Sequence, residues 1–176
     1  MINIFLTFAV GIEAKFINFD FVDRWAEKII SQLDNAQPWL FELLLSKNEM
    51  NALEIFRNNI YKGMENSEIS QFQSSRNRKY VELFLGFLYL SYKENKISYD
   101  ELMSQAGEIL DIYGLDHWSI ETFVSVTSGI ANIFEEDIPI NRLFLSCAKC
   151  AQHEFLYLQS DECMHDNLLV LTCTQN

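Results

Sequence analysis

The residues best suited to chemistry are four cysteines and two histidines near the end of the chain. Cys147 and Cys150 form a Cys-x-x-Cys pair, and Cys163-x-His165 follows at a distance that resembles the spacing in a zinc finger. Thiolate sulfur and imidazole nitrogen are the ligands that zinc prefers. Cys147, Cys150, Cys163 and His165 are therefore the candidate zinc ligands, and His153 lies between the two pairs.

Two features of the same segment favour inert thiols over a metal site. Cys147 lies on the apolar stripe of an expected helix, and on such a helix Cys147 and His153 point about 120° apart. A structural zinc site normally places its first cysteine pair on a glycine-containing turn, and this segment has no glycine. Because buried cysteine commonly packs as a small apolar residue, we expect no metal ion and no cofactor. The zinc site stays open as the alternative.

Other catalytic patterns are absent from the sequence. The histidines His117, His153 and His165 are not accompanied by a recognisable nucleophile motif. No strand is expected before the Cys-x-x-Cys pair, as a thioredoxin-like site requires. The chain has no Walker sequence, no glycine-rich dinucleotide loop and no His-Glu-x-x-His. We therefore expect a protein without enzymatic activity and assign no catalytic residue.

Three pairs of adjacent carboxylates occur in the second half of the chain, at Asp100/Glu101, Glu135/Glu136 and Asp161/Glu162. In a pocket, such pairs serve glycosidases and metal-dependent phosphoesterases. Acids near helix starts are also stabilised by the helix dipole while they stay solvated. A small metal-dependent hydrolase that uses these pairs or the Cys/His tail is therefore kept as an alternative function.

Helical spacing of apolar residues, together with capping residues, predicts about seven helices joined by short connections. The expected helices cover 18–33, 39–45, 48 to about 63, 80–93, 99–113, 116 onward and 139–159. The start of the 99–113 helix is marked by Ser98-Tyr-Asp-Glu101, which is a capping-box sequence. Its residues Asp100, Ser104, Glu108 and Asp111 lie opposite an apolar arc.

Two other helix starts are predicted, the first of them against a local electrostatic rule. The 80–93 helix follows Arg76, Arg78 and Lys79, whose positive charges would oppose the dipole at a helix start. The last helix is expected to begin at Pro139, because proline suits the first turn of a helix.

Three segments are predicted to lie outside these helices: an apolar arm at 1–15, interpreted as a strand or buried arm, a polar loop at 63–75 and a C-terminal tail at 160–176. The chain has 176 residues, is 49% hydrophobic and holds only six Gly and two Pro, which fits one helical domain over residues 1–176. We predict an all-α, single-domain bundle of antiparallel helix hairpins, with a solenoid-like stacking of helix pairs as the alternative.

The N-terminus gives no sign of a targeting segment. It lacks the basic region and cleavage site of a signal peptide, and no apolar run reaches the ~20 residues of a membrane helix. We therefore expect no membrane association and a cytoplasmic protein with reduced thiols.

Positive charge nearly stops after Lys96. Residues 1–96 hold 12 acids and 11 Lys or Arg, whereas residues 97–176 hold 13 acids and only Arg142 and Lys149. A field of one sign attracts a basic partner and repels nucleic acid and anionic lipid. We therefore predict a basic protein partner and no nucleic acid. The predicted contact residues are Asp100, Glu101, Glu108, Asp111, Asp116, Glu121, Glu135, Glu136, Asp137 and the neighbouring Trp118.

Two segments carry a resemblance to a known group of proteins. They are Phe16-Ile-Asn-Phe-Asp-Phe-Val-Asp-Arg-Trp25, and Leu83-Phe-Leu-Gly-Phe-Leu-Tyr-Leu90 followed by Tyr113-Gly-Leu-Asp-His-Trp118 and Phe123. With its small size, acidity and helical pattern, the chain resembles the immunity proteins of bacterial polymorphic toxin systems, notably contact-dependent growth inhibition. The resemblance implies a protein that binds the C-terminal toxin domain of a secreted effector, often a nuclease, and blocks its active site or substrate surface.

Two other classes of binding protein stay open at this point. One is an acidic helical adaptor for another basic protein, and the other is a DNA-mimic anti-repressor. A DNA mimic spaces carboxylates like phosphates over a long surface, so the balanced charge of residues 1–96 favours the first of the two. The oligomeric state and the identity of the toxin stay open as well.

Overall fold

The chain folds into helices packed side by side and across one another. The computed structural model describes residues 4–61, 66–113 and 133–160, with side chains described for 4–61, 78–112 and 143–160. The helices of these residues are α1 (Ile4–Glu13), α2 (Phe19–Ile30), α3 (Pro38–Leu45), α4 (Glu49–Asn59), α5 (Asn66–Lys93), α6 (Tyr99–Tyr113) and α8 (Ile133–Gln159). The described part has no strand, so the predicted all-α fold is confirmed.

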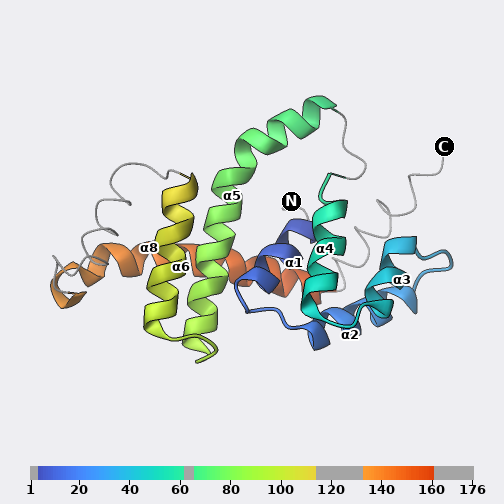
Figure 1. The fold of residues 1–176 in the computed structure, drawn as a ribbon, viewed down its shortest axis with the longest axis horizontal. Helices are drawn as coiled ribbons and strands as arrows, with labels where there is room; N and C mark the ends of the chain where they lie inside the picture. The colour runs from blue at the N-terminus through green and yellow to red at the C-terminus, as the bar shows by residue number, and fades with distance from the viewer. Residues whose placement is uncertain (1–3, 62–65, 114–132, 161–176) are drawn as a thin grey trace.

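The arrangement is a bundle around the two longest helices, α5 and α8. α5 and α6 stand side by side, and α8 runs across them (Figure 1). The hairpins of α2 with α3 and of α3 with α4 lie toward the other end of the molecule (Figure 1). α1 lies between the two ends and packs against α4, α5 and α8.

The apolar N-terminal segment is a buried helix. Of the two interpretations of this segment, the strand is wrong, whereas the buried arm agrees with the structure. One side of α1, including Leu6 and Val10, joins a core shared with α5, α6 and α8. Another side, including Phe8 and Ile12, joins a second core formed with α2, α3 and α4. A helix buried on two sides has no polar face. Its sequence therefore lacks the 3.6-residue pattern that separates helix from strand.

Three predicted helix starts are confirmed by their capping bonds. The side-chain oxygen of Asn18 accepts a bond from the backbone N–H of Phe21, and that of Asn48 accepts from Asn51, both at 3.0 Å. The Ser98 hydroxyl accepts from the backbone N–H of Glu101 at 3.1 Å. Each bond satisfies an amide that the first helical turn leaves without a partner in the helix.

Two predicted helix boundaries are wrong. α5 begins at Asn66, so most of the predicted 63–75 loop is helical. The cations predicted to open a helix therefore lie inside one, where Arg78 pairs with Glu82 one turn later at 3.0 Å. α8 begins at Ile133 and contains Pro139 in its interior. Pro139 is the seventh residue of α8, so it lacks one backbone N–H donor of the helix, and the helix nevertheless continues past it.

α5 and α8 cross at unusually short range, and a glycine permits it. A Cβ atom added at Gly86 would lie 2.2 Å from the backbone oxygen of Cys147 and 2.7 Å from the Cβ of Ala151. Real Cβ atoms essentially never approach other atoms closer than 3.0 Å. The absence of a side chain at Gly86 thus sets the spacing of the two longest helices.

The turns that follow α1 and α5 have the same backbone structure, 80 residues apart. Lys15 and Asn95 both adopt a left-handed conformation with φ of 58°. After each of them, the next amide bonds back to the carbonyl five residues earlier, Phe16 to Gly11 and Lys96 to Ser91, both at 2.9 Å. This is the Schellman arrangement that closes a helix. The matching segments read Lys-Phe-Ile-Asn-Phe-Asp from Lys15 and Asn-Lys-Ile-Ser-Tyr-Asp from Asn95.

The two turns also bind each other. The buried hydroxyl of Ser91 donates to the backbone oxygen of Ala14 at 2.8 Å, and Lys96 Nζ donates to that of Phe16 at 2.9 Å. Lys15 Nζ lies 2.5 Å from Glu101 Oε1. The start of α6 is therefore fixed against the end of α1, which determines the direction in which the exposed face of α6 points.

Candidate functional site

The candidate site is a line of carboxylates on the exposed face of α6. Asp100, Ser104, Glu108 and Asp111 are exposed, as the sequence predicts, while Leu102, Ala106 and Leu110 on the opposite face are buried. Spacings of four, four and three residues keep the line on one face of the helix and extend it over about 16 Å. We call Asp100, Ser104, Glu108 and Asp111 the α6 acidic stripe.

Glu101 lies beside the stripe but has a structural role. Its side chain is 33% exposed, and its carboxylate accepts from Lys15 Nζ at 2.5 Å and from Gln105 Nε2 at 3.0 Å. Its backbone amide is capped by Ser98. Since this carboxylate already has a cation, it contributes less to an attractive surface than the three acids of the stripe.

The ion pairs of the described residues leave the stripe without a cation. Lys15, Arg57, Arg78 and Lys96 pair with Glu101, Glu13, Glu82 and Glu94, respectively. No described Lys or Arg lies within ion-pair distance of Asp100, Glu108 or Asp111. The structure thus identifies acids of the cation-poor region whose charge no described side chain compensates.

An exposed apolar residue accompanies the stripe and was missed by the sequence analysis. Ile112 is 63% exposed. It follows Glu108 by four residues, so the two side chains are neighbours on the helix surface. A helical wheel places Ile112 at the border of the acidic arc, and that position was the available signal. Interfaces combine an apolar centre with a polar rim, and Ile112 with its neighbouring carboxylates offers both kinds of group.

Several predicted contact residues cannot be placed at this surface. Asp116, Trp118 and Glu121 lie outside the described residues. Glu135, Glu136 and Asp137 are in the first turns of α8 by their backbone, and their side chains are outside the described part.

The Cys-x-x-Cys pair lies on α8 at the crossing with α5. Cys147 is 5% exposed, and burial, followed by the charge of Glu82, raises the pKa of its thiol to about 12. Burial and the nearby Glu154 also raise the pKa of the half-buried Cys150 thiol. Both shifts favour the protonated thiol over the thiolate that binds metal or attacks an electrophile.

The described residues contain no group of three or more His, Cys, Asp or Glu side chains arranged to hold a metal ion. His153 is largely exposed and lies 3.6 Å from its neighbour Glu154. The two further candidate zinc ligands, Cys163 and His165, are outside the described residues. Within the described part of the Cys/His motif, Cys147 belongs to the core at the α5–α8 crossing and the half-buried Cys150 packs against it.

Comparisons with known proteins give no relative. No known protein family matches the chain, and no curated protein or solved structure matches it. Among the described helices, none is both long and apolar enough to cross a membrane.

Proposed function

We propose that this protein is an immunity protein that binds and neutralises a basic toxin domain through the α6 acidic stripe. The observation that carries the proposal is the set of three exposed carboxylates, Asp100, Glu108 and Asp111, without a cation from any described side chain. A surface built only for solubility intersperses charges of both signs. A stripe of one sign is costly to the folded state through self-repulsion, and a basic partner removes that cost.

A nuclease toxin supplies the complementary chemistry. Nucleases bind phosphates through Lys and Arg, and the stripe presents carboxylates over about 16 Å of helix. Such complementarity raises association rates to about 10⁸–10⁹ M⁻¹s⁻¹ at low salt. Fast capture suits a protein that acts in the cytoplasm before a toxin reaches its substrate, and covering the phosphate-binding surface blocks the toxin directly.

Ile112 provides the apolar part of the proposed contact. Charges at an interface mainly accelerate association, whereas buried apolar groups near its centre slow dissociation. In this proposal Ile112 rests in an apolar recess of the toxin, and the neighbouring carboxylates hold Lys or Arg around it. The two kinds of residue therefore have separable kinetic effects.

The test begins with the partner. Tagged protein is used to capture proteins from the producing bacterium at low and at high salt, and the captured protein is then expressed alone. We expect a basic protein that arrests growth, with growth restored by co-expression of the present chain. A captured basic protein without toxicity would indicate the adaptor function in place of immunity.

The residues are tested by stopped-flow association with that partner. Glu108→Lys combined with Asp111→Lys should lower the association rate constant by about tenfold or more and flatten its salt dependence. Glu27→Lys with Asp34→Lys, two exposed acids away from α6, is the control with the same change in net charge and should have a smaller effect. Ile112→Ala should mainly raise the dissociation rate constant. Equal effects of the two charge-reversed pairs would contradict the assigned face.

A further inference from the structure

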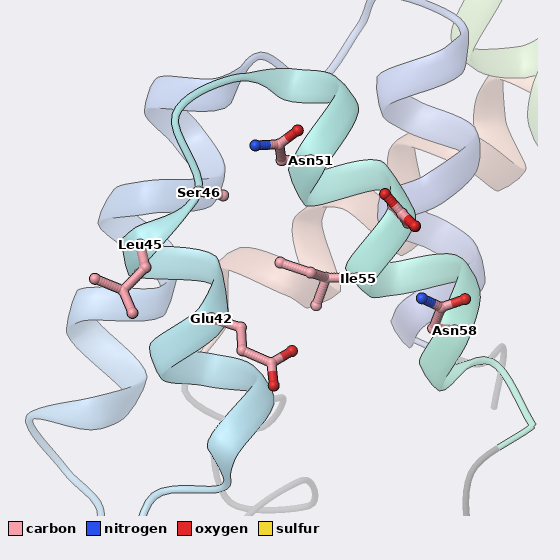
Figure 2. Close-up of a pocket in the computed structure, with 7 residues that line it drawn as sticks. Glu42, Leu45, Ser46, Asn51, Ile55 and Asn58 are labelled. Atoms are coloured by element: carbon pink, nitrogen blue, oxygen red, sulfur yellow. The ribbon is translucent and has the colours of Figure 1, made fainter.

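A second surface lies between α3 and α4. Glu42, Leu45 and Ser46 of the first helix and its end, and Asn51, Glu54, Ile55 and Asn58 of the second, line an open groove of about 310 Å³. Glu42 points toward α4 and Ile55 points toward α3, with Asn51 and Asn58 further along the same side of α4 (Figure 2). Residues 51, 54, 55 and 58 are one helical face of α4, so the lining is a regular surface.

Apolar side chains gather on this hairpin to a degree that the rest of the described surface does not show. Leu45 is 78% exposed, Met50 is 67% exposed and Phe41 is 47% exposed. These are three of the six large hydrophobic residues that are exposed in the described part, and they lie within ten residues of one another. Leu45 lines the groove, and Phe41 and Met50 are next in sequence to its lining residues Glu42 and Asn51. A gathering of exposed apolar groups is typical of an interaction surface.

The charge of the groove defines its occupant. Its two ionisable lining residues are Glu42 and Glu54, and neither has an ion pair or a hydrogen bond with a described residue. Arg57, the arginine of α4, is held by Glu13 through bonds of 2.6 and 3.1 Å. The exposed Lys47 follows Ser46 in the chain but is not among the lining residues. The oxygens of Ser46, Asn51 and Asn58 add acceptors for N–H donors.

We propose that the α3–α4 groove binds a short cationic segment of another protein, with one leucine-sized side chain against Ile55 and an Arg or Lys paired with Glu42 and Glu54. The volume lies at the lower end of the range of about 300–1,000 Å³ for ligand sites, which suits one or two side chains and excludes a large cofactor. The groove lies away from α6, across α1 and α5 (Figure 1). This inference is therefore independent of the α6 acidic stripe and of the toxin.

The test uses the whole protein and a defined probe. The peptide acetyl-Arg-Leu-Leu-Arg-amide is titrated into isotope-labelled protein, and NMR follows the Ile55 methyl groups and the side-chain amides of Asn51 and Asn58. We expect saturable shifts confined to these groups and their neighbours, and no such shifts with acetyl-Glu-Leu-Leu-Glu-amide. Equal binding of the acidic peptide, or shifts centred on α6, would overturn the proposal.

Matched variants make the assignment residue-specific. Glu42→Lys with Glu54→Lys should weaken peptide binding by about tenfold, whereas Glu27→Lys with Asp34→Lys should weaken it by less than about threefold. If the first pair perturbs the spectrum outside the groove, Glu42→Gln with Glu54→Gln replaces it, with an intermediate loss expected. Equal losses in the groove and control variants would refute the site.

Other occupants give different results in the same experiment. If dilution of the protein alone reproduces the shifts, the groove binds a second copy of this chain. If arginine amide binds as tightly as the peptide, the groove is a site for a small cation and the apolar contact is not used. Either result overturns a cationic protein segment as the occupant. Failure of this test leaves the association experiment on Glu108 and Asp111 unaffected, so the two proposals are judged separately.

Discussion

The contact at Gly86 gives the sharpest prediction about the fold, because the atoms that oppose a side chain there are backbone atoms. In Gly86→Ala, the new Cβ would lie 2.2 Å from the oxygen and 2.6 Å from the carbon of the Cys147 carbonyl group. If the opposing atoms belonged to a side chain, they could rotate away, but the Cys147 carbonyl is part of the backbone of α8 and cannot. The helices must therefore separate locally by roughly 1 Å, which on a van der Waals potential loses a quarter to a half of each affected contact.

The size of the effect follows from two opposing terms. Overpacking of a core costs about 1–3 kcal/mol, and the upper part of the range applies because the α5–α8 contact is the most extensive in the described structure. Alanine is favoured over glycine within a helix by about 1 kcal/mol. The net expected loss in the free energy of unfolding is about 1–2 kcal/mol, or a fall in Tm of roughly 2–8 °C for a chain of this size.

Urea and thermal unfolding of the variant check this value, with Gly11→Ala as the matched control. The three atoms nearest to a Cβ at Gly11 all belong to the side chain of Ile17, at 2.5, 2.7 and 3.4 Å, and this side chain, although buried, can shift more easily than a helix backbone. We therefore expect Gly11→Ala to cost less than Gly86→Ala, and Ala151→Gly to relieve part of the Gly86→Ala loss. A Gly86→Ala protein as stable as the parent would refute the short α5–α8 distance.

Two further predictions concern ionisable groups. Burial raises the pKa of the Cys147 thiol from its ordinary value of 9.0 to about 12 in the folded protein, so above pH 9 the unfolded state binds fewer protons and stability falls as pH rises toward 12. The stability difference between the parent and Cys147→Ala should therefore shrink by about 2 kcal/mol between pH 7.5 and pH 10.5 in urea titrations, and a constant difference would contradict the burial of the thiol. Arg57→Ala should cost about 1–2 kcal/mol, because Glu13 is 15% exposed and keeps only the Tyr80 hydroxyl, 2.5 Å away, as its other described partner. The exposed pair of Lys96 with Glu94 is the comparison, and a larger contribution from it in double-mutant cycles would argue against the Glu13 network.

Features that depend on local backbone chemistry were predictable. The caps at Asn18, Asn48 and Ser98 and the two faces of α6 follow from hydrogen bonding within one helical turn and from a 3.6-residue period. The position of Cys147 on the apolar stripe of its helix was also predicted, and Cys147 is buried. An apolar residue every three or four positions is visible in a sequence because each of these helices has one solvent-exposed face and one buried face.

Other features of the fold depend on tertiary contacts, which the apolar pattern of a single helix does not contain. α1 is helical although its sequence fits a strand, because two cores bury it on two sides. The α3–α4 groove depends on how two helices diverge. The distance at Gly86 depends on which helix crosses it. None of these three features is encoded by the spacing of residues along one element.

The same division applies to the acidic half of the chain. The sequence alone determined that residues 97–141 carry no cation, and it placed Asp100, Glu108 and Asp111 on the exposed face of one helix. Only the tertiary structure separated Glu101 from them, since its cation, Lys15, comes from a turn 86 residues away. A charge count is fixed by composition, whereas the compensation of each charge depends on which segments the fold brings within a few ångströms.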